Sequence, residues 1–179
     1  MTQIYYLPGR GGRVNGGLGA ALAQFGEVRG RELSGDFARL RFDEQVELIR
    51  ADLHGQDCPV VANSFGCYLL LNALLDQPSY PGRILLLSPV LGDAENPDTG
   101  MVYCPPRARK FMDALLACKL RFAAPTHVLV GSEDWQSNRT ALPLLRASGA
   151  LVEELSGIGH ELGKEAVGEA LRGLWSLFD

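Results

Sequence analysis

Short apolar runs alternate with longer segments whose apolar residues recur every three or four positions. The short runs predict β-strands and the longer segments predict helices. The expected strands cover residues 4–7, 27–33, 59–63, 83–87, 126–130 and 151–155. The expected helices cover residues 17–25, 36–53, 65–75, 107–119, 138–147 and 161–178. Residues 89–106 are rich in Pro, Gly and Asp and are expected to be irregular.

This alternation of strands and helices is typical of an α/β protein. It predicts a three-layer α/β/α sandwich around a mostly parallel, six-stranded sheet. The strand Ile84-Leu85-Leu86-Leu87 is apolar throughout, as expected for a strand covered on both faces. The strand at 27–33 is more polar and is expected near the sheet edge. With 179 residues and no linker or repeat, we expect one domain over residues 1–179.

A serine stands where the strand at 59–63 passes into the helix at 65–75. A strained strand-to-helix turn can project a serine hydroxyl from the top of a sheet. Ser64 is therefore a candidate nucleophile. In open parallel sheets, sites lie at the carboxyl ends of the strands. Only residues that directly follow a strand are thus expected to join Ser64.

The chain has three histidines, and this rule separates them. His54 precedes the strand at 59–63 and is expected at the opposite end of the sheet. His127 lies inside a strand and is expected to be a satisfied structural residue. His160 follows the last strand in a glycine-flanked loop. His160 is therefore the candidate general base.

Three acidic residues follow strands and could orient that histidine. Asp134 comes just after the strand at 126–130, and a carboxylate there could fix the imidazole tautomer and stabilise the imidazolium. Glu133 is the neighbouring alternative, and Asp93 is a weaker one. The preferred set is Ser64, Asp134 and His160 in that chain order.

The chain resembles the α/β-hydrolase superfamily, specifically its small, lidless serine hydrolases, over nearly its whole length. Four segments carry the resemblance, and each follows the expected strand. They are the nucleophile elbow Ala62-Asn63-Ser64-Phe65-Gly66, similar to G-x-S-x-G; Leu7-Pro8-Gly9-Arg10-Gly11-Gly12, similar to the oxyanion loop H-G-x-G; the acid loop Gly131-Ser132-Glu133-Asp134; and the histidine loop Gly159-His160.

The resemblance implies a minimal six-stranded fold with spatial order 2-1-3-4-5-6, lacking the two leading strands of the family. It also implies that the backbone N–H groups of Arg10 and Phe65 form the oxyanion hole. Two positions depart from the family pattern. Ala62 replaces the first elbow glycine, which we expect to cost some strain, and Pro8 replaces a common histidine.

The expected activity is hydrolysis of an ester, thioester or amide of a small or accessible acyl group, with no cofactor and no metal. Residues 89–125 hold one loop and one helix where relatives insert a lid, so an open site is expected. Met101, Val102 and Tyr103 could line it or pack the loop onto the sheet. Arg10 and Arg13 flank it and could favour an anionic substrate, although a surface role is open for both.

Composition limits the partners. The net charge of −4 gives no electrostatic reason to expect nucleic acid or an anionic membrane. No apolar run approaches the roughly 20 residues that span a bilayer, and no basic-then-apolar leader opens the chain. We expect a cytoplasmic protein acting on a small-molecule acyl substrate, with its oligomeric state left open. The four cysteines lack C-x-x-C spacing and are expected to be free thiols: Cys58, Cys67, Cys104 and Cys118.

Two alternatives remain at this stage. Gly9-Arg10-Gly11 after the first strand, with Glu32 after the second, suggests a nucleotide-binding domain. That fingerprint is incomplete because Val14 occupies the third glycine position. The other alternative keeps the α/β-hydrolase fold as a non-catalytic binding module, because fold alone does not determine function.

Overall fold

The computed structural model describes the backbone of residues 2–176 and the side chains of residues 2–173. The end of the helix expected at 161–178 therefore lies outside the described residues. The main-sheet strands are β1 Gln3–Leu7, β2 Glu27–Gly30, β3 Val60–Asn63, β4 Ile84–Leu87, β7 Thr126–Gly131 and β8 Ala150–Leu155. The helices are α1 Leu18–Leu22, α2 Gly35–Arg39, α3 Phe42–Leu53, α4 Phe65–Leu74, α5 Ala108–Leu116, α6 Ala141–Ala147 and α7 Lys164–Ser176.

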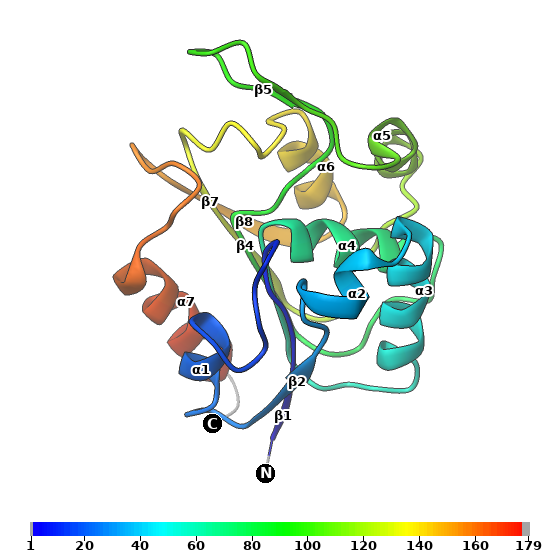
Figure 1. Cartoon of the computed structure of the whole chain (residues 1–179), viewed down its shortest axis with the longest axis vertical. Coiled ribbons are helices and arrows are strands. Elements are labelled where there is room, and N and C mark those ends of the chain that lie inside the picture. The colour runs from blue at the N-terminus through cyan, green and yellow to red at the C-terminus, as the bar shows by residue number, and fades with distance from the viewer. Residues whose placement is uncertain (1, 177–179) are drawn as a thin grey trace.

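The main sheet has the order β2-β1-β3-β4-β7-β8, and every neighbouring pair is parallel. Counted along the chain, its six strands lie in the predicted order 2-1-3-4-5-6. The more polar strand β2 lies at an edge, also as predicted. All carboxyl ends therefore point the same way, toward the top of Figure 1.

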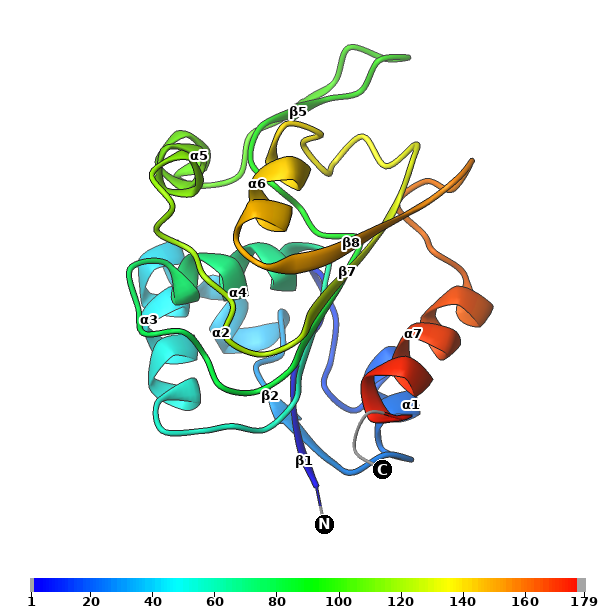
Figure 2. The same cartoon turned by 180° about the vertical axis from the view of Figure 1, so that it is seen from behind.

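Helices cover both faces of the sheet, which confirms the predicted α/β/α sandwich. Helices α1 and α7 lie on one face and the other five on the opposite face (Figures 1 and 2). Alternate side chains along a strand point to opposite faces. In β1, Ile4 and Tyr6 accordingly join the core under α1 and α7, while Tyr5 and Leu7 join the larger core under the other helices.

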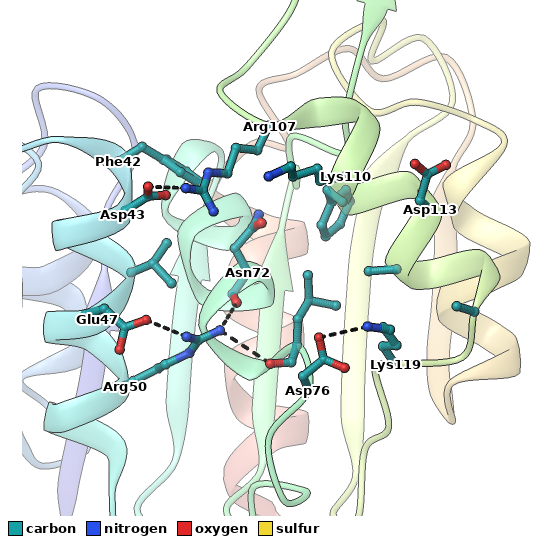
Figure 3. A pocket seen from close by; sticks show the side chains of 15 residues that line it. Phe42, Asp43, Glu47, Arg50, Asn72, Asp76, Arg107, Lys110, Asp113 and Lys119 are labelled. Carbon is teal, nitrogen blue, oxygen red and sulfur yellow. Dashed lines mark hydrogen bonds and ion pairs between the residues drawn. The ribbon is translucent and has the colours of Figure 1, made fainter.

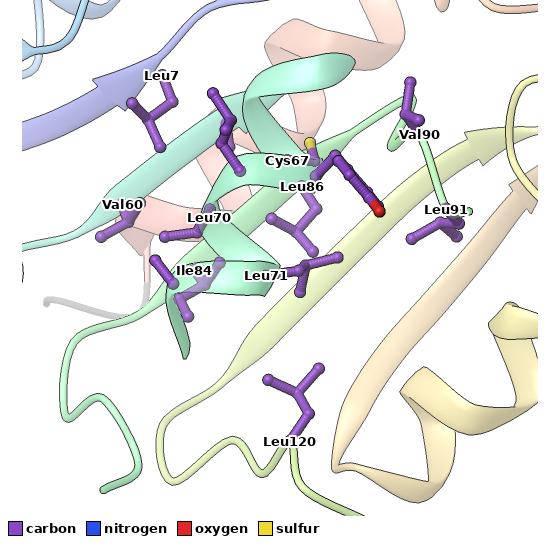
Figure 4. Packing of buried hydrophobic residues seen from close by; sticks show 14 of the residues in the cluster. Leu7, Val60, Cys67, Leu70, Leu71, Ile84, Leu86, Val90, Leu91 and Leu120 are labelled. Atoms are coloured by element: carbon purple, nitrogen blue, oxygen red, sulfur yellow. The ribbon is translucent and has the colours of Figure 1, made fainter. Parts of the chain in front are cut away.

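Helix α4 lies in the middle of the larger core. Every residue from Phe65 to Ala73 is buried, which explains why its sequence is apolar almost all round. Cys67, Leu70 and Leu71 pack toward the strand residues beneath the helix (Figure 4). The helix that follows Ser64 is therefore held firmly, and so is the turn that precedes it.

The segment expected as one helix over residues 36–53 is two helices, α2 and α3. The backbone is extended at Leu40 and Arg41, between them. The Arg41 N–H donates to the Glu44 carboxylate at 2.9 Å, which satisfies a donor at the start of α3. The side-chain amide of Gln45 donates to the Phe37 carbonyl at 2.9 Å and satisfies the end of α2. The single-helix prediction was wrong for this local reason.

The stretch expected to be irregular contains an antiparallel hairpin, β5 Ala94–Glu95 and β6 Val102–Tyr103. The carboxamide of Asn96 accepts the N–H groups of Asp98 and Thr99 and so shapes the turn between the strands. The hairpin projects beyond the carboxyl edge of the main sheet (Figure 1).

All four cysteines are free, as predicted. Among the residues described, no helix has the combined length and apolar character that crossing a bilayer requires.

Candidate active site

Ser64 connects β3 to α4 in a backbone conformation that L-residues rarely adopt, with φ 52° and ψ −119°. Three backbone hydrogen bonds hold this turn. The Ser64 N–H donates to Leu87 at 2.9 Å, and the Ser64 carbonyl accepts from Cys67 at 3.1 Å and Val90 at 3.3 Å. The strained conformation is therefore built into the folded chain.

Ala62 fits the elbow without distorting the strand. It is fully buried and keeps regular parallel register with Leu7 on one side and Leu86 on the other. Its backbone does not have a positive φ. The replacement of the usual glycine is thus accommodated inside β3, and the structure shows no backbone strain at this position.

His160 reaches Ser64 across the carboxyl edge of the sheet. Its Nε2 lies 2.8 Å from the Ser64 hydroxyl oxygen, although 96 residues separate the two in sequence. The Ser88 hydroxyl donates to the His160 carbonyl and fixes the loop between β8 and α7. The imidazole remains 26% exposed, so it can reach solvent.

Asp134 lies behind the histidine and its side chain is fully buried. Its Oδ2 is 2.9 Å from Nδ1 of His160. The Gln136 N–H donates to Oδ1 at 3.0 Å, and the Ser137 hydroxyl lies 3.2 Å from Oδ2. These contacts satisfy the oxygens of a carboxyl group that is removed from solvent. With a proton on Nδ1, the imidazole donates to Asp134 and accepts from Ser64, so one tautomer satisfies both contacts.

The alternative residues do not reach this arrangement. Glu133 and Asp93 are exposed, and among the described acidic side chains only Asp134 bonds His160. His54 is exposed beyond the end of α3, away from the carboxyl edge. His127 pairs across strands with Glu153 at 3.0 Å, which agrees with its expected structural role.

The two expected oxyanion donors belong to segments that adjoin Ser64. Phe65 is the first residue of α4, where an N–H has no partner within the helix. Arg10 belongs to the loop after β1, and that loop lies against the nucleophile: a β-carbon on Gly9 would be 3.2 Å from the β-carbon of Ser64. Within the described residues, neither N–H has a hydrogen-bond partner. Both are therefore free to donate to a ligand.

A groove of about 1260 Å³ contains the Ser64 and His160 side chains and extends between α1 and α7. At its mouth, the Arg10 guanidinium lies over the Phe65 ring, 3.8 Å from the centroid, and 3.3 Å from the Tyr103 hydroxyl. From the hairpin, only Tyr103 lines the groove.

Three surface expectations need correction. Met101 and Val102 neither line the groove nor pack onto the sheet; they are 57% and 66% exposed. Arg13 does not line the groove either. Of the two arginines expected to flank the site, only Arg10 does so.

A second hollow, of about 720 Å³, lies between α3, α4 and α5 and contains none of these residues. Figure 3 shows that charged side chains line it and form ion pairs with one another. Lys119 bonds Asp76 at 3.2 Å, and Arg50 bonds Glu47 at 2.5 Å. Its charges are thus largely matched within the chain.

Sequence reasoning missed three residues that support the site. Ser88 directly follows β4, so the strand-end rule places it at this edge, but a serine hydroxyl there does not by itself indicate a bond to the histidine loop. Gln136 and Ser137 come two and three positions after Asp134. A bond from an aspartate side chain to the N–H group two residues later is the signature of an Asx turn, which could have revealed Gln136 but not the hydroxyl contact of Ser137.

No known family pattern and no curated protein matches this chain. Solved structures do match it. Monoacylglycerol lipase from Paleococcus ferrophilus superposes with a TM-score of 0.67 at 14% identity, covering 98% of this chain and 93% of the lipase. Mouse alpha/beta hydrolase domain-containing protein 10 gives a TM-score of 0.66 at 13% identity, covering 99% and 88% of the two chains. The chain has the α/β-hydrolase fold. Esterase PE8 superposes similarly, with a TM-score of 0.63 at 18% identity over 98% and 92% of the two chains.

Two features of the structure argue against the nucleotide-binding alternative. A dinucleotide-binding sheet has the order 3-2-1-4-5-6, which this sheet does not have. In nucleotide sites the glycine loop opens directly into a helix, whose N-terminus holds the phosphates. Here Gly9 lies against Ser64, and α1 begins only at Leu18.

Proposed function

We propose that this protein is a serine hydrolase that cleaves a carboxylic ester or thioester of an accessible acyl group through an acyl-enzyme. The observation that carries the proposal is the unbroken chain of contacts from Ser64 Oγ to His160 Nε2, at 2.8 Å, and from His160 Nδ1 to Asp134 Oδ2, at 2.9 Å. A nucleophile, a base within reach and a group that orients the base are the parts that acyl transfer requires.

In the first half-reaction, His160 Nε2 takes the hydroxyl proton as Ser64 Oγ bonds to the substrate carbonyl carbon. The imidazolium that forms is stabilised by the buried Asp134 carboxylate. His160 then gives this proton to the leaving alcohol or thiol as its bond to carbon breaks. Ser64 is left acylated.

In the second half-reaction, a water molecule replaces the leaving group. His160 removes a proton from the water as its oxygen attacks the acyl-serine. The proton then returns to Ser64 Oγ, and the carboxylic acid is released. In both halves the N–H groups of Phe65 and Arg10 are proposed to hold the developing oxyanion, a role typically worth roughly 10²–10³ in turnover per donor.

The decisive test is Ser64→Ala, assayed on p-nitrophenyl acetate beside the parent. Hydrolysis should fall by at least about 10³, because triad members act as a unit. Ser79→Ala, an exposed serine in the loop after α4, is the matched control and should retain parental activity. Equal rates for the parent and Ser64→Ala would overturn the proposal.

A small fluorophosphonate separates the enzyme from a binding module of the same fold. An adduct on Ser64 of the folded parent, absent from Ser64→Ala, supports an activated nucleophile. A folded parent that forms no adduct favours the binding module.

A further inference from the structure

The groove that contains Ser64 changes character along its length. Beside the nucleophile, three polar side chains, Arg10, Tyr103 and Gln136, line it together with the apolar residues Phe65, Leu87 and Val90. Away from the nucleophile it passes between α1 and α7, where five aliphatic side chains line it: Leu18, Ala21, Leu162, Val167 and Leu171. Three exposed polar side chains also line this part: Gln24, Glu161 and Lys164. One end therefore suits a polar reacting group and the other an apolar chain.

The aliphatic arm is only partly covered by the protein. Leu18 and Val167 pack onto the smaller core yet remain half-exposed, and Ala21 is exposed. An apolar hollow joined to a reactive serine offers hydrophobic stabilisation to any apolar chain attached to the reacting carbonyl group. The paired charged side chains that line the hollow between α3, α4 and α5 (Figure 3) make that second hollow unsuitable for such a chain.

Glycine keeps this arm open. Gly168 lines the groove from the interior of α7, where glycine is less stable than alanine. A β-carbon there would have a single neighbour within 4 Å, the Arg172 Nη1 at 3.6 Å. Neither backbone strain nor a close contact requires glycine at this position, so a larger side chain would project into open space of the groove.

We propose that the arm between α1 and α7 binds an unbranched aliphatic chain of the substrate. This inference rests on the proposed hydrolase activity and names the substrate class of that site. The aliphatic chain can belong to the acyl part or to the alcohol part of an ester, and two substrate series distinguish these sources. One series is p-nitrophenyl esters from acetate to decanoate; the other is alkyl acetates from ethyl to decyl.

In the series that uses the arm, kcat/KM should rise about two- to fourfold for each added methylene until the arm is filled. Gly168→Leu should abolish this rise, and Gly168→Ala should reduce it by a smaller amount. Glu169→Leu is the matched control, because it places the same side chain on an exposed position of α7 outside the groove. The control should keep the parental dependence on chain length.

A rise in the acyl series or in the alcohol series that Gly168→Leu removes supports the proposal and identifies which part the arm holds. The proposal is overturned if kcat/KM rises in neither series, or if Gly168→Leu leaves the rise unchanged. Hydrolysis of the shortest ester by the parent in that case means that the proposed activity stands and the aliphatic-chain proposal alone has failed.

Direct binding tests the arm when no ester is hydrolysed. Decanoate and acetate are titrated by calorimetry into Ser64→Ala and into the Ser64→Ala, Gly168→Leu double variant. Saturable decanoate binding that the Gly168 substitution weakens at least tenfold, with no matching acetate binding, supports the aliphatic site. Undetectable decanoate binding, or equal binding by both proteins, overturns it.

Discussion

A β-carbon on Gly66 would lie 2.3 Å from the carbonyl oxygen of Leu7. The first turn of α4 therefore rests directly on the last residue of β1. Because Leu7 leads into the loop that contains Arg10, this contact holds the two proposed oxyanion donors on adjoining segments. Gly66 therefore allows α4 to pack closely on β1, in addition to its place in the turn.

Gly66→Ala should destabilise the protein by about 1–3 kcal/mol, because the added carbon meets backbone atoms that cannot rotate away. Urea unfolding measures the change. Gly168→Ala is the control, since its new carbon meets only the end of a flexible arginine, and it should stabilise by about 0.5–1 kcal/mol. Equal effects of the two substitutions would contradict the close packing inferred at Gly66.

Ser64→Gly should be inactive and also more stable than Ser64→Ala by about 1 kcal/mol. Both variants lose the hydroxyl and its bond to His160, so the comparison isolates the backbone. Glycine adopts a φ of 52° without the steric cost that alanine bears. Thermal or urea unfolding of the two inactive proteins provides the measurement, and an alanine variant as stable as the glycine variant would argue against a strained turn.

Asp134→Asn should lower kcat on p-nitrophenyl acetate by about 10³–10⁴ at neutral pH. The amide can present its NH₂ group to Nδ1, which favours the tautomer that cannot accept the Ser64 proton. Asp93→Asn, which changes the weaker candidate acid, should stay within about twofold of the parent. A large loss at Asp93 with little loss at Asp134 would reverse the assignment.

Arg10→Pro removes a backbone N–H, whereas Arg10→Ala removes only the side chain. If the Arg10 N–H holds the oxyanion, the proline variant should lose roughly 10²–10³ in kcat on a neutral ester. The alanine variant should lose no more than about threefold. Circular dichroism and melting temperature establish that both proteins fold, and comparable kcat values for the two folded variants would exclude this donor.

A half-buried ion pair at the sheet edge should make stability depend on acid pH. Arg31 binds Asp52 through two hydrogen bonds of 2.6 and 2.7 Å, and the Tyr5 hydroxyl donates a third at 2.7 Å. Burial raises the pKa of Asp52, but these hydrogen bonds and the arginine charge outweigh it, so the pKa lies below its ordinary value. The resulting stabilisation is present above the unfolded pKa of about 3.9 and is lost as pH falls through the folded pKa.

Asp52→Asn should therefore unfold more easily than the parent at pH 6, and the difference should shrink as pH falls from about 5 toward 2. Urea unfolding across that range measures it. Asp36→Asn, in an exposed pair with Arg39, should change stability by less than about 0.5 kcal/mol at any of these pH values. A constant difference between the parent and Asp52→Asn would contradict the lowered pKa.

The strands and the placement of Ser64, Asp134 and His160 at one edge of the sheet could be expected from the sequence for one physical reason, whereas the strand order was implied by the resemblance to the α/β-hydrolase superfamily. Buried strands leave continuous apolar runs, and parallel strands bring the residues that follow them to one edge. The histidine and the aspartate were selected by position alone. The structure places both within hydrogen-bond distance in the expected order, and their chemical roles remain the proposal above.

Other features depend on contacts that periodicity does not encode. Phe42, Val46, Ile49 and Leu53 form a helical stripe that belongs to α3 alone, and nothing in that stripe signals the extended residues just before it. The groove needs two helices from opposite ends of the chain, α1 and α7, to lie side by side with space between them. Only the three-dimensional structure shows the space between α1 and α7.

The cores on the two faces of the sheet differ in size, and this difference has an evolutionary consequence. Helix α4, which fixes the nucleophile, is embedded in the larger core, while the groove lies on the thinly covered face of α1 and α7. Changes of chain-length preference can therefore accumulate on α1 and α7 without disturbing the turn that holds Ser64. In a directed-evolution library confined to the groove-facing positions of those helices, most variants should still fold. In a library of equal size around α4, most variants should fail to fold.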